Sequence, residues 1–459
     1  MPTEECPLNT VCHTQLSFAN LGRKPVLATF DGGKITSDAG APLLREIDRR
    51  TGLLRAINAC IEDPRDPRKV RHAQLTLLRQ RIFAIALGYE DANDHNTLRS
   101  DPALKIAAGH APDSHPDLAS QPTLSRLENR ITPRQLVRLA RVLVESYIAA
   151  HPRPHSLIVL DIDSTDDPAH GRQQLALFHG FYDQYMFHPL LVFDGLTGYP
   201  LAAVLRSGRA HASKGAATIL RTIIRRLKKA YPDAHILVRA DSGFATPTLY
   251  RTLERLGVSY TIGLIPNARL RERLAPLVEQ AQEQFETTEK KQRTFTAFSY
   301  KADSWKRPRR VVAKVEYHSL GSNTRFVVTN LRHLTPQRVY DDLYIGRGDT
   351  ENRIKELKLH LKADRTSCHR FEANQFRLLL HTFAYALLWH VRQAAAGTEL
   401  ATASMDTLRL KLLKIGARVK ESVRRVVLQC ASSYPYRELL STILVNLACL
   451  QPQPVPLRV

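Results

Sequence analysis

Apolar residues recur at helical spacing over the first third of the chain. The segments 75–88 (LTLLRQRIFAIALG) and 134–150 (RQLVRLARVLVESYIAA) each place apolar side chains on one stripe, as amphipathic helices do. Ser125 and Glu128 have the spacing of a capping box, which predicts a helix entrance there. Residues 1–155 are therefore predicted to form a helical N-terminal region.

The pattern changes at residue 156, where short apolar, β-branched runs begin. The run before Asp161 predicts a buried strand, and residues 188–195 and 199–208 predict two more strands, paired as antiparallel neighbours. Helix and strand patterns then alternate at residues 212–230, 235–241, 247–256 and 258–264. Three strands followed by this alternation predict an α/β fold with a mixed sheet.

Residues 292–330 alternate apolar and polar positions, as short antiparallel strands do. We therefore predict a β-strand insertion at 266–330, within an α/β domain built from 156–265 and 331–395. Thr335 followed by Pro336 predicts the start of a long helix. Further helices, predicted at 371–395 and at about 403–428, make 396–459 a helical C-terminal region.

The charge of the chain narrows the class of partner. Among 459 residues there are 66 Lys and Arg against 44 Asp and Glu, a net charge of +22. This excess favours a polyanion such as nucleic acid, although a basic protein without such a role is the alternative. No apolar run approaches the ~18 residues that span a bilayer, and no signal peptide is evident. We expect a cytoplasmic protein without a membrane partner.

Acidic residues stand where two predicted strands end. Asp161 and Asp163 alternate with Ile162, so both carboxylates lie on one face of the strand, and Asp241 ends a neighbouring strand. Ligands of open α/β sheets bind outside the carboxyl ends of the strands. Two acids there would repel each other unless a cation lay between them, whereas ordinary turn chemistry is the alternative.

A third acid lies on the long predicted helix. At ~100° per residue, four side chains fall within about 60° of one another: Tyr344, Arg347, Glu351 and Lys358. An apolar stripe runs beside this row, so Glu351 borders the face that packs on the sheet, whereas Glu356 projects away from it. A helix salt-bridge row, in which Arg347 and Lys358 pair with Glu351, is the alternative.

These four residues match the Y-x2-R-x3-E-x6-K signature, and from about residue 31 onward the chain resembles DDE transposases of bacterial insertion sequences. It looks most like the insertion-sequence thirteen-eighty family. The resemblance implies an RNase-H-like catalytic domain whose triad is Asp163, Asp241 and Glu351. Asp163 is preferred to Asp161 because Ser164 and Thr165 follow it, as in related proteins. Tyr344, Arg347 and Lys358 would contact phosphates at the DNA ends.

Three carboxylates suit two Mg²⁺ ions, since Mg²⁺ prefers hard oxygen ligands; Mn²⁺ could substitute. The implied function is a transposase that binds terminal inverted repeats, cleaves DNA and joins it to target DNA by cut-and-paste transposition. Double-stranded DNA is the expected partner, with a homodimer or higher oligomer in the synaptic complex and a nucleoid-associated location. The alternatives are an RNase-H-like nuclease without strand transfer and a catalytically inactive DNA-binding derivative.

Two basic clusters are predicted to hold DNA, although solvated faces are the alternative. One extends from residue 206 to 229, and the other surrounds Trp305; the candidate contacts are Arg206, Lys214, Arg225, Arg307, Arg309 and Arg310. Trp305 is predicted either to stack on an extruded base or to anchor the core of the insertion. In the N-terminal region, residues 63–72 and 120–129 are candidates for reading the inverted repeats.

Overall fold

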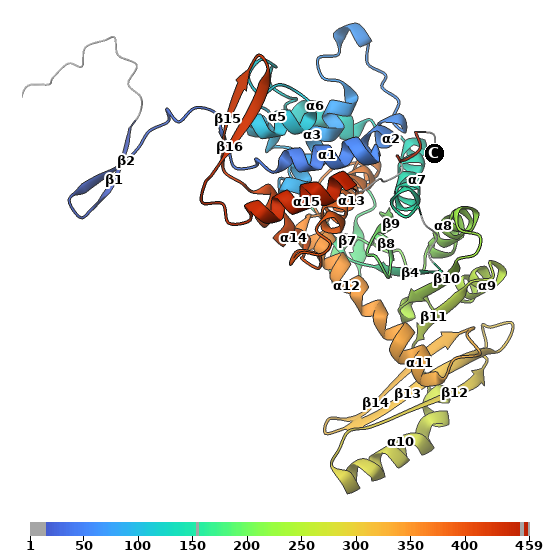
Figure 1. The fold of residues 1–459 in the computed structure, drawn as a ribbon. Helices are drawn as coiled ribbons and strands as arrows, with labels where there is room; N and C mark the ends of the chain where they lie inside the picture. The colour runs from blue at the N-terminus through green and yellow to red at the C-terminus, as the bar shows by residue number, and fades with distance from the viewer. Residues whose placement is uncertain (1–14, 153–155, 450–453, 458–459) are drawn as a thin grey trace, which may run out of the picture.

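The computed structural model describes residues 15–152, 156–449 and 454–457. Helices fill residues 41–150, as predicted: α1 (Ala41–Thr51), α2 (Leu53–Ala59), α3 (Gln74–Leu87), α4 (His95–Leu98), α5 (Pro102–Ala108), α6 (Gln121–Asn129) and α7 (Pro133–Ala150). The predicted helical N-terminal region also contains strands. A hairpin of β1 (Leu16–Leu21) and β2 (Lys24–Ala28) precedes the helices and projects from the body (Figure 1).

The predicted capping box at Ser125 and Glu128 is wrong. Helix α6 already begins at Gln121, so both residues lie inside it. The capping box belongs to the next helix, α7, where the Thr132 hydroxyl and the Gln135 side chain exchange hydrogen bonds with each other's backbone N–H. Glu128 is therefore left for another role.

One mixed sheet of eight strands runs through the middle of the molecule, in the order β12-β13-β14-β11-β10-β4-β8-β9. The strands are β4 (Leu157–Ser164), β8 (Leu190–Asp194), β9 (Pro200–Val204), β10 (His235–Ala240), β11 (Ser259–Leu264), β12 (Gln292–Tyr300), β13 (Arg309–His318) and β14 (Gly321–Thr329). Strands β4, β10 and β11 are parallel neighbours, and β4, β8 and β9 are joined antiparallel. This arrangement confirms the predicted mixed α/β architecture.

Two helices connect the central strands, α8 (Ala216–Ala230) and α9 (Pro247–Arg255). The segment predicted as a β insertion opens instead with a long helix, α10 (Ala268–Thr288), whose Leu270, Leu274 and Ala281 are buried. Its three strands extend the central sheet, since β14 pairs with β11. They form the lower arm of the molecule in Figure 1, with α10 beside them.

The C-terminal third begins with an almost unbroken helical stretch from Pro336 to His360, which includes α11 (Pro336–Arg338) and α12 (Gly348–Lys355). Helix α13 (Phe371–Ala394) follows as predicted and is buried along most of its length. After it come α14 (Met405–Leu408) and α15 (Arg437–Cys449). No helix in the described part of the chain is long and apolar enough to cross a membrane.

The helix predicted at about 403–428 is wrong beyond Leu413. A hairpin of β15 (Ala417–Ser422) and β16 (Arg425–Cys430) occupies that stretch and pairs with β3 (Ile35–Thr36). Ala417 and Val419 are buried while Arg418 and Lys420 are exposed, which is the period of two that a strand requires. The C-terminal region is therefore not wholly helical.

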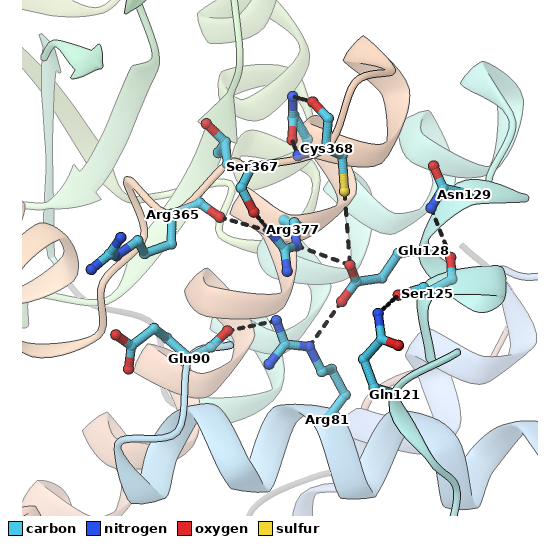
Figure 2. Close-up of polar contacts among 12 residues, drawn as sticks. Arg81, Glu90, Gln121, Ser125, Glu128, Asn129, Arg365, Ser367, Cys368 and Arg377 are labelled. Carbon is cyan, nitrogen blue, oxygen red and sulfur yellow. Dashed lines mark hydrogen bonds and ion pairs between the residues drawn. The ribbon is translucent and has the colours of Figure 1, made fainter. Parts of the chain in front are cut away.

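A buried charge cluster joins the N-terminal helices to α13 (Figure 2). Glu128, only 2% exposed, accepts from Arg81 Nε of α3 at 2.8 Å and from Arg377 Nε of α13 at 2.9 Å. Burial alone would raise the pKa of Glu128, but the two guanidinium groups lower it below its ordinary value. Each arginine also donates to a backbone carbonyl, of Glu90 or Arg365. The cluster fixes α3, α6 and α13 relative to one another.

Candidate active site

Two of the predicted acids lie at the carboxyl ends of neighbouring parallel strands. Ile162 of β4 pairs with Ala240 of β10, so Asp163 and Asp241 are the next residues in the same register. Asp241 leaves the strand and caps the short turn that follows, accepting from Gly243 N–H at 3.0 Å. The sheet thus brings together the ends of two strands whose acids are 78 residues apart in sequence, as their predicted strand-end positions implied.

The two carboxylates do not ionise independently. Burial, followed by the charge of Asp241, raises the pKa of Asp163 to about 7, and the Asp163 side chain is only 13% exposed. Burial also raises the pKa of Asp241, against the opposing effect of Arg347. Two acids that are costly to ionise together favour a bound cation, and carboxylates are the ligands that Mg²⁺ prefers.

Arg347 connects the strand acid to the helix acid. Its Nη1 lies 3.3 Å from Asp163 Oδ2, and its Nη2 lies 3.2 Å from Glu351 Oε1. Glu351 is 65% exposed and is bonded to Arg347. Among the described residues, no three His, Cys, Asp or Glu side chains lie close enough together to hold a metal ion. Glu351 is thus linked to Asp163 through the guanidinium group of Arg347.

The other two residues of the row also face this end of the sheet. Lys358 Nζ lies 2.7 Å from Asp166 Oδ1, so Lys358 pairs with a strand-end acid and not with Glu351. Tyr344 packs against β11 beside Asp241, and burial raises its pKa. A Cβ at Gly263 would lie 2.6 Å from Tyr344 Oη, so only glycine leaves room for this ring. The row therefore contacts the sheet and is more than a solvated salt-bridge ladder.

Asp161, on the same face as Asp163, has a different environment. It is fully buried and accepts two hydrogen bonds from Arg239, at 2.5 and 2.6 Å, and one from the Thr350 hydroxyl at 2.9 Å. Arg239 in turn donates to the backbone carbonyl of Leu343. This network anchors the helical stretch on the sheet. The sequence analysis missed Arg239 and Thr350. An arginine in a strand and a threonine in a helix carry no sequence signal that predicts a hydrogen bond to Asp161.

Glu356 lies on the opposite side of the helical stretch, as the helix phase predicted. It is not solvated, however. Its carboxylate accepts from the Tyr385 hydroxyl at 3.0 Å and from Arg392 at 3.3 Å, both on α13. Glu356 therefore ties the helical stretch to α13 and is remote from the strand acids.

Several predicted DNA contacts are instead engaged within the fold. Arg206 is buried and donates to the carbonyls of His188, His211, Ala212 and Lys214, and burial lowers its pKa to about 10. Arg309 is buried against Glu254, and Arg310 donates to the carbonyls of Leu331 and Leu334. The basic side chains that remain exposed are Lys214, Arg225 and Arg307, the last paired with Glu254 at 2.6 Å.

Trp305 is part of the core. It is 4% exposed, and its ring makes edge contacts with Tyr250 and Tyr300, with Arg309 over its face. A stacking platform needs an accessible ring face, which this indole lacks. The position corresponds to the alternative role, a tryptophan that anchors the arm.

A basic cavity opens among the N-terminal helices. It measures about 790 Å³ and is lined by six Lys and Arg side chains, two histidines and one acid: Arg65, Lys69, Arg71, Arg99, Arg126, Arg130, His72, His115 and Asp117. Residues from both candidate segments, 63–72 and 120–129, thus line this one cavity. Lys69, Arg71 and Arg126 are exposed and have no ion-pair partner among the described residues. We name this site the basic cavity.

Over residues 18–452 the chain matches the family described as Transposase DDE domain group 1. It is therefore an enzyme of the DDE class, a DNA transposase. More particularly, it belongs to that family. A solved piggyBac transposase, in a synaptic complex with hairpin DNA, shares 11% identity over 82% of this chain and 79% of that chain, with a TM-score of 0.39. No curated protein sequence matches the chain.

Proposed function

We propose that the chain is the transposase of a bacterial insertion sequence, similar to the insertion-sequence thirteen-eighty family, which moves its element by metal-dependent cut-and-paste transposition. The observation that carries this proposal is the meeting of Asp163 and Asp241 across paired strand ends, with Arg347 joining them to Glu351. The strand order β9-β8-β4-β10-β11, with β8 antiparallel, supports an RNase-H-like catalytic domain.

Asp163, Asp241 and Glu351 are the proposed metal ligands. These three carboxylates would hold the divalent ions between them. When bound, two divalent cations supply activation of the attacking oxygen and stabilisation of the leaving oxygen at phosphorus. The raised pKa of Asp163 fits this assignment, because the carboxylate pair is stable as a dianion only beside additional positive charge.

The remaining residues of the row would position DNA. Arg347 and Lys358 carry fixed charges at the rim of the site and suit phosphate oxygens. Tyr344, which packs against β11, would support the same rim of the site. At the site, water would first attack the phosphorus at the element end, and the P–O bond that breaks would leave a 3′-hydroxyl. That hydroxyl would then attack a target phosphate, an exchange of one phosphodiester for another.

We assign the parts of the chain accordingly. Residues 1–155 would bind the terminal inverted repeats, 156–265 and 331–395 would carry catalysis, 266–330 would form the arm, and 396–459 would complete the C-terminal region. Two copies or more would hold paired DNA ends in a synaptic complex. Of the exposed cations, Lys214, Arg225 and Arg307 remain proposed contacts to double-stranded DNA.

Cleavage tests the proposal directly. With Mg²⁺, the purified chain should cut a plasmid that carries the DNA flanking its coding region, at the borders of inverted repeats. EDTA should suppress cutting, and Mn²⁺ should restore it, because the carboxylates alone cannot activate water. Mapped cuts that ignore the repeats, without later joining to a second plasmid, would indicate a nuclease without strand transfer. No metal-dependent cutting of any DNA would contradict the proposal.

The basic cavity should supply part of the affinity for duplex DNA. Replacing Lys69, Arg71 and Arg126 with glutamate should weaken binding and reduce the slope of log affinity against log salt by about 2 to 3, since each lost phosphate contact removes roughly 0.9. Fluorescence anisotropy between 50 and 200 mM salt would measure this slope.

A triple charge reversal at other exposed arginines of the same region, Arg45, Arg55 and Arg141, is the matched control. It changes the net charge by the same amount, so it should lower affinity only through the general field and leave the slope nearly unchanged. Equal slopes in the two triple variants would remove the basic cavity from the DNA interface.

A further inference from the structure

A small aromatic hairpin lies beside the proposed active site. Strands β6 (Leu177–His179) and β7 (Gln184–Phe187) form it, and β5 (Asp167–Pro168) pairs with β7. Gln184 donates to Asp166 at 3.3 Å, and Asp166 is the carboxylate that pairs with Lys358. The hairpin is therefore attached to the same rim that carries the row of site residues.

The hairpin has one packed face and one exposed aromatic face. Met186 of β7 is buried on one face, whereas Phe178 and Tyr185, paired across the strands, are exposed and contact each other edge to face at 5.6 Å. At the tip, Phe181 is 85% exposed. The solvated face of an antiparallel hairpin is ordinarily polar, so a cluster of exposed aromatic rings indicates a binding surface.

The tip of the hairpin lies near the strand-end acids. Tyr182 contacts Phe181 edge to face at 5.1 Å. Tyr182 also contacts His188 edge to face at 5.9 Å, and His188 lies two residues before Leu190, which pairs with Ser164 next to Asp163. Phe181 thus extends outward from a residue that borders the site.

We propose that Phe181, at the tip of this hairpin, stacks on an unpaired base of the DNA strand whose phosphate lies at Asp163 and Asp241. The inference rests on the proposed function, because it places the base next to the phosphate being cut. The site carboxylates repel further phosphate groups at this position, whereas an uncharged base is not repelled. Arg347 and Lys358 hold the phosphate, and the ring holds the adjoining base, as apolar wedges do between unstacked base steps.

Two probes test the inference with the full-length protein in EDTA, which prevents cutting. One is a forked duplex with 2-aminopurine as its first unpaired base, and the other is the same duplex fully paired. Stacking quenches 2-aminopurine, so the wild type should bind the fork more tightly and lower its fluorescence. Phe181→Ala should bind the fork about tenfold more weakly and lose the quenching, with its affinity for the paired duplex unchanged.

Phe181→Trp should keep both properties, since it retains a ring. Phe30→Ala, which removes another phenylalanine that is exposed to solvent, is the control and should behave as wild type. Undiminished preference and quenching in Phe181→Ala would overturn the inference while leaving the proposed function intact. A change of oligomeric state in that variant, with unchanged DNA binding, would assign the ring to a second copy of the chain and also overturn it. A wild type that binds neither probe would contradict the proposed function itself.

Discussion

Replacing any of the three proposed ligands, as Asp163→Asn, Asp241→Asn or Glu351→Gln, should lower metal-dependent cleavage by about a thousandfold or more. Each change removes a carboxylate charge on which cation binding depends, and a loss of several kcal/mol in transition-state stabilisation corresponds to that factor. DNA binding in EDTA should be nearly unchanged. Single-turnover cleavage of a labelled element end would measure the loss.

Asp349→Asn is the matched control, because Asp349 is an exposed acid on the same helical turn as Glu351. It should cut at the wild-type rate. Asp161→Asn is a poor control, since it breaks a buried pair with Arg239 and should destabilise the fold. Near-normal cleavage by Glu351→Gln would remove the helix acid from the site.

Asp163→Asn has a second, metal-free consequence. The raised pKa of Asp163 means that the folded protein binds its proton more tightly than the unfolded chain does. The associated stability is present below the ordinary Asp pKa and is lost as the pH rises toward about 7. Asparagine has no charge to repel Asp241, so this variant should melt at a higher temperature than the wild type in EDTA at pH 8. A lower melting temperature would contradict the proposed repulsion.

Glu128→Gln should lower the free energy of unfolding by about 3–5 kcal/mol, the largest stability effect that we expect. It leaves Arg81 and Arg377 buried with no counter-charge, and an unpaired buried charge is strongly destabilising. Thermal melting followed by circular dichroism would measure it. Because the folded pKa of Glu128 is lowered, its contribution is present above the ordinary Glu pKa and is lost as the pH falls.

Glu62→Gln provides the comparison. Glu62 pairs with Arg138 at 3.1 Å but is largely exposed, so this change should alter stability by less than about 1 kcal/mol. If Glu128→Gln and Glu62→Gln had the same melting temperature, the cluster in Figure 2 would not be holding the helices together.

The central strands and the acids at their ends could be predicted from the sequence. In an α/β fold, an apolar β-branched run that stops at an acid has few structural interpretations other than a buried strand. It could not separate Asp161 from Asp163 by alternation alone, since both point the same way. Burial separates them: one is enclosed by Arg239 and Thr350, and the other borders solvent. That distinction depends on side chains from β10 and α12, which lie far away in sequence.

Other differences between the sequence predictions and the structure have separate physical causes. The helix predicted at about 403–428 overlooks the alternation at 417–420, where Ala417 and Val419 are buried and Arg418 and Lys420 are exposed. For Trp305, the base-stacking alternative follows from the cations around it in sequence, yet Arg309 is drawn inward by Glu254 and the indole is buried beside it, as the core alternative predicts. A basic side chain near a predicted site can instead donate to backbone carbonyls, as Arg206 does, and sequence spacing does not reveal which role it has.

The ladder of the central sheet runs from β4, which bears Asp163, through β10, β11, β14 and β13 to β12 at the edge. A flexible joint between the arm and the strand ends that bear Asp163 and Asp241 would require several of these backbone hydrogen bonds to break together. The arm and the acids should therefore move as one unit. Any ligand surface that the arm contacts is then held at a constant distance from the reacting phosphate. The arm can therefore set the distance between these two points of the ligand, and it does not close over the site.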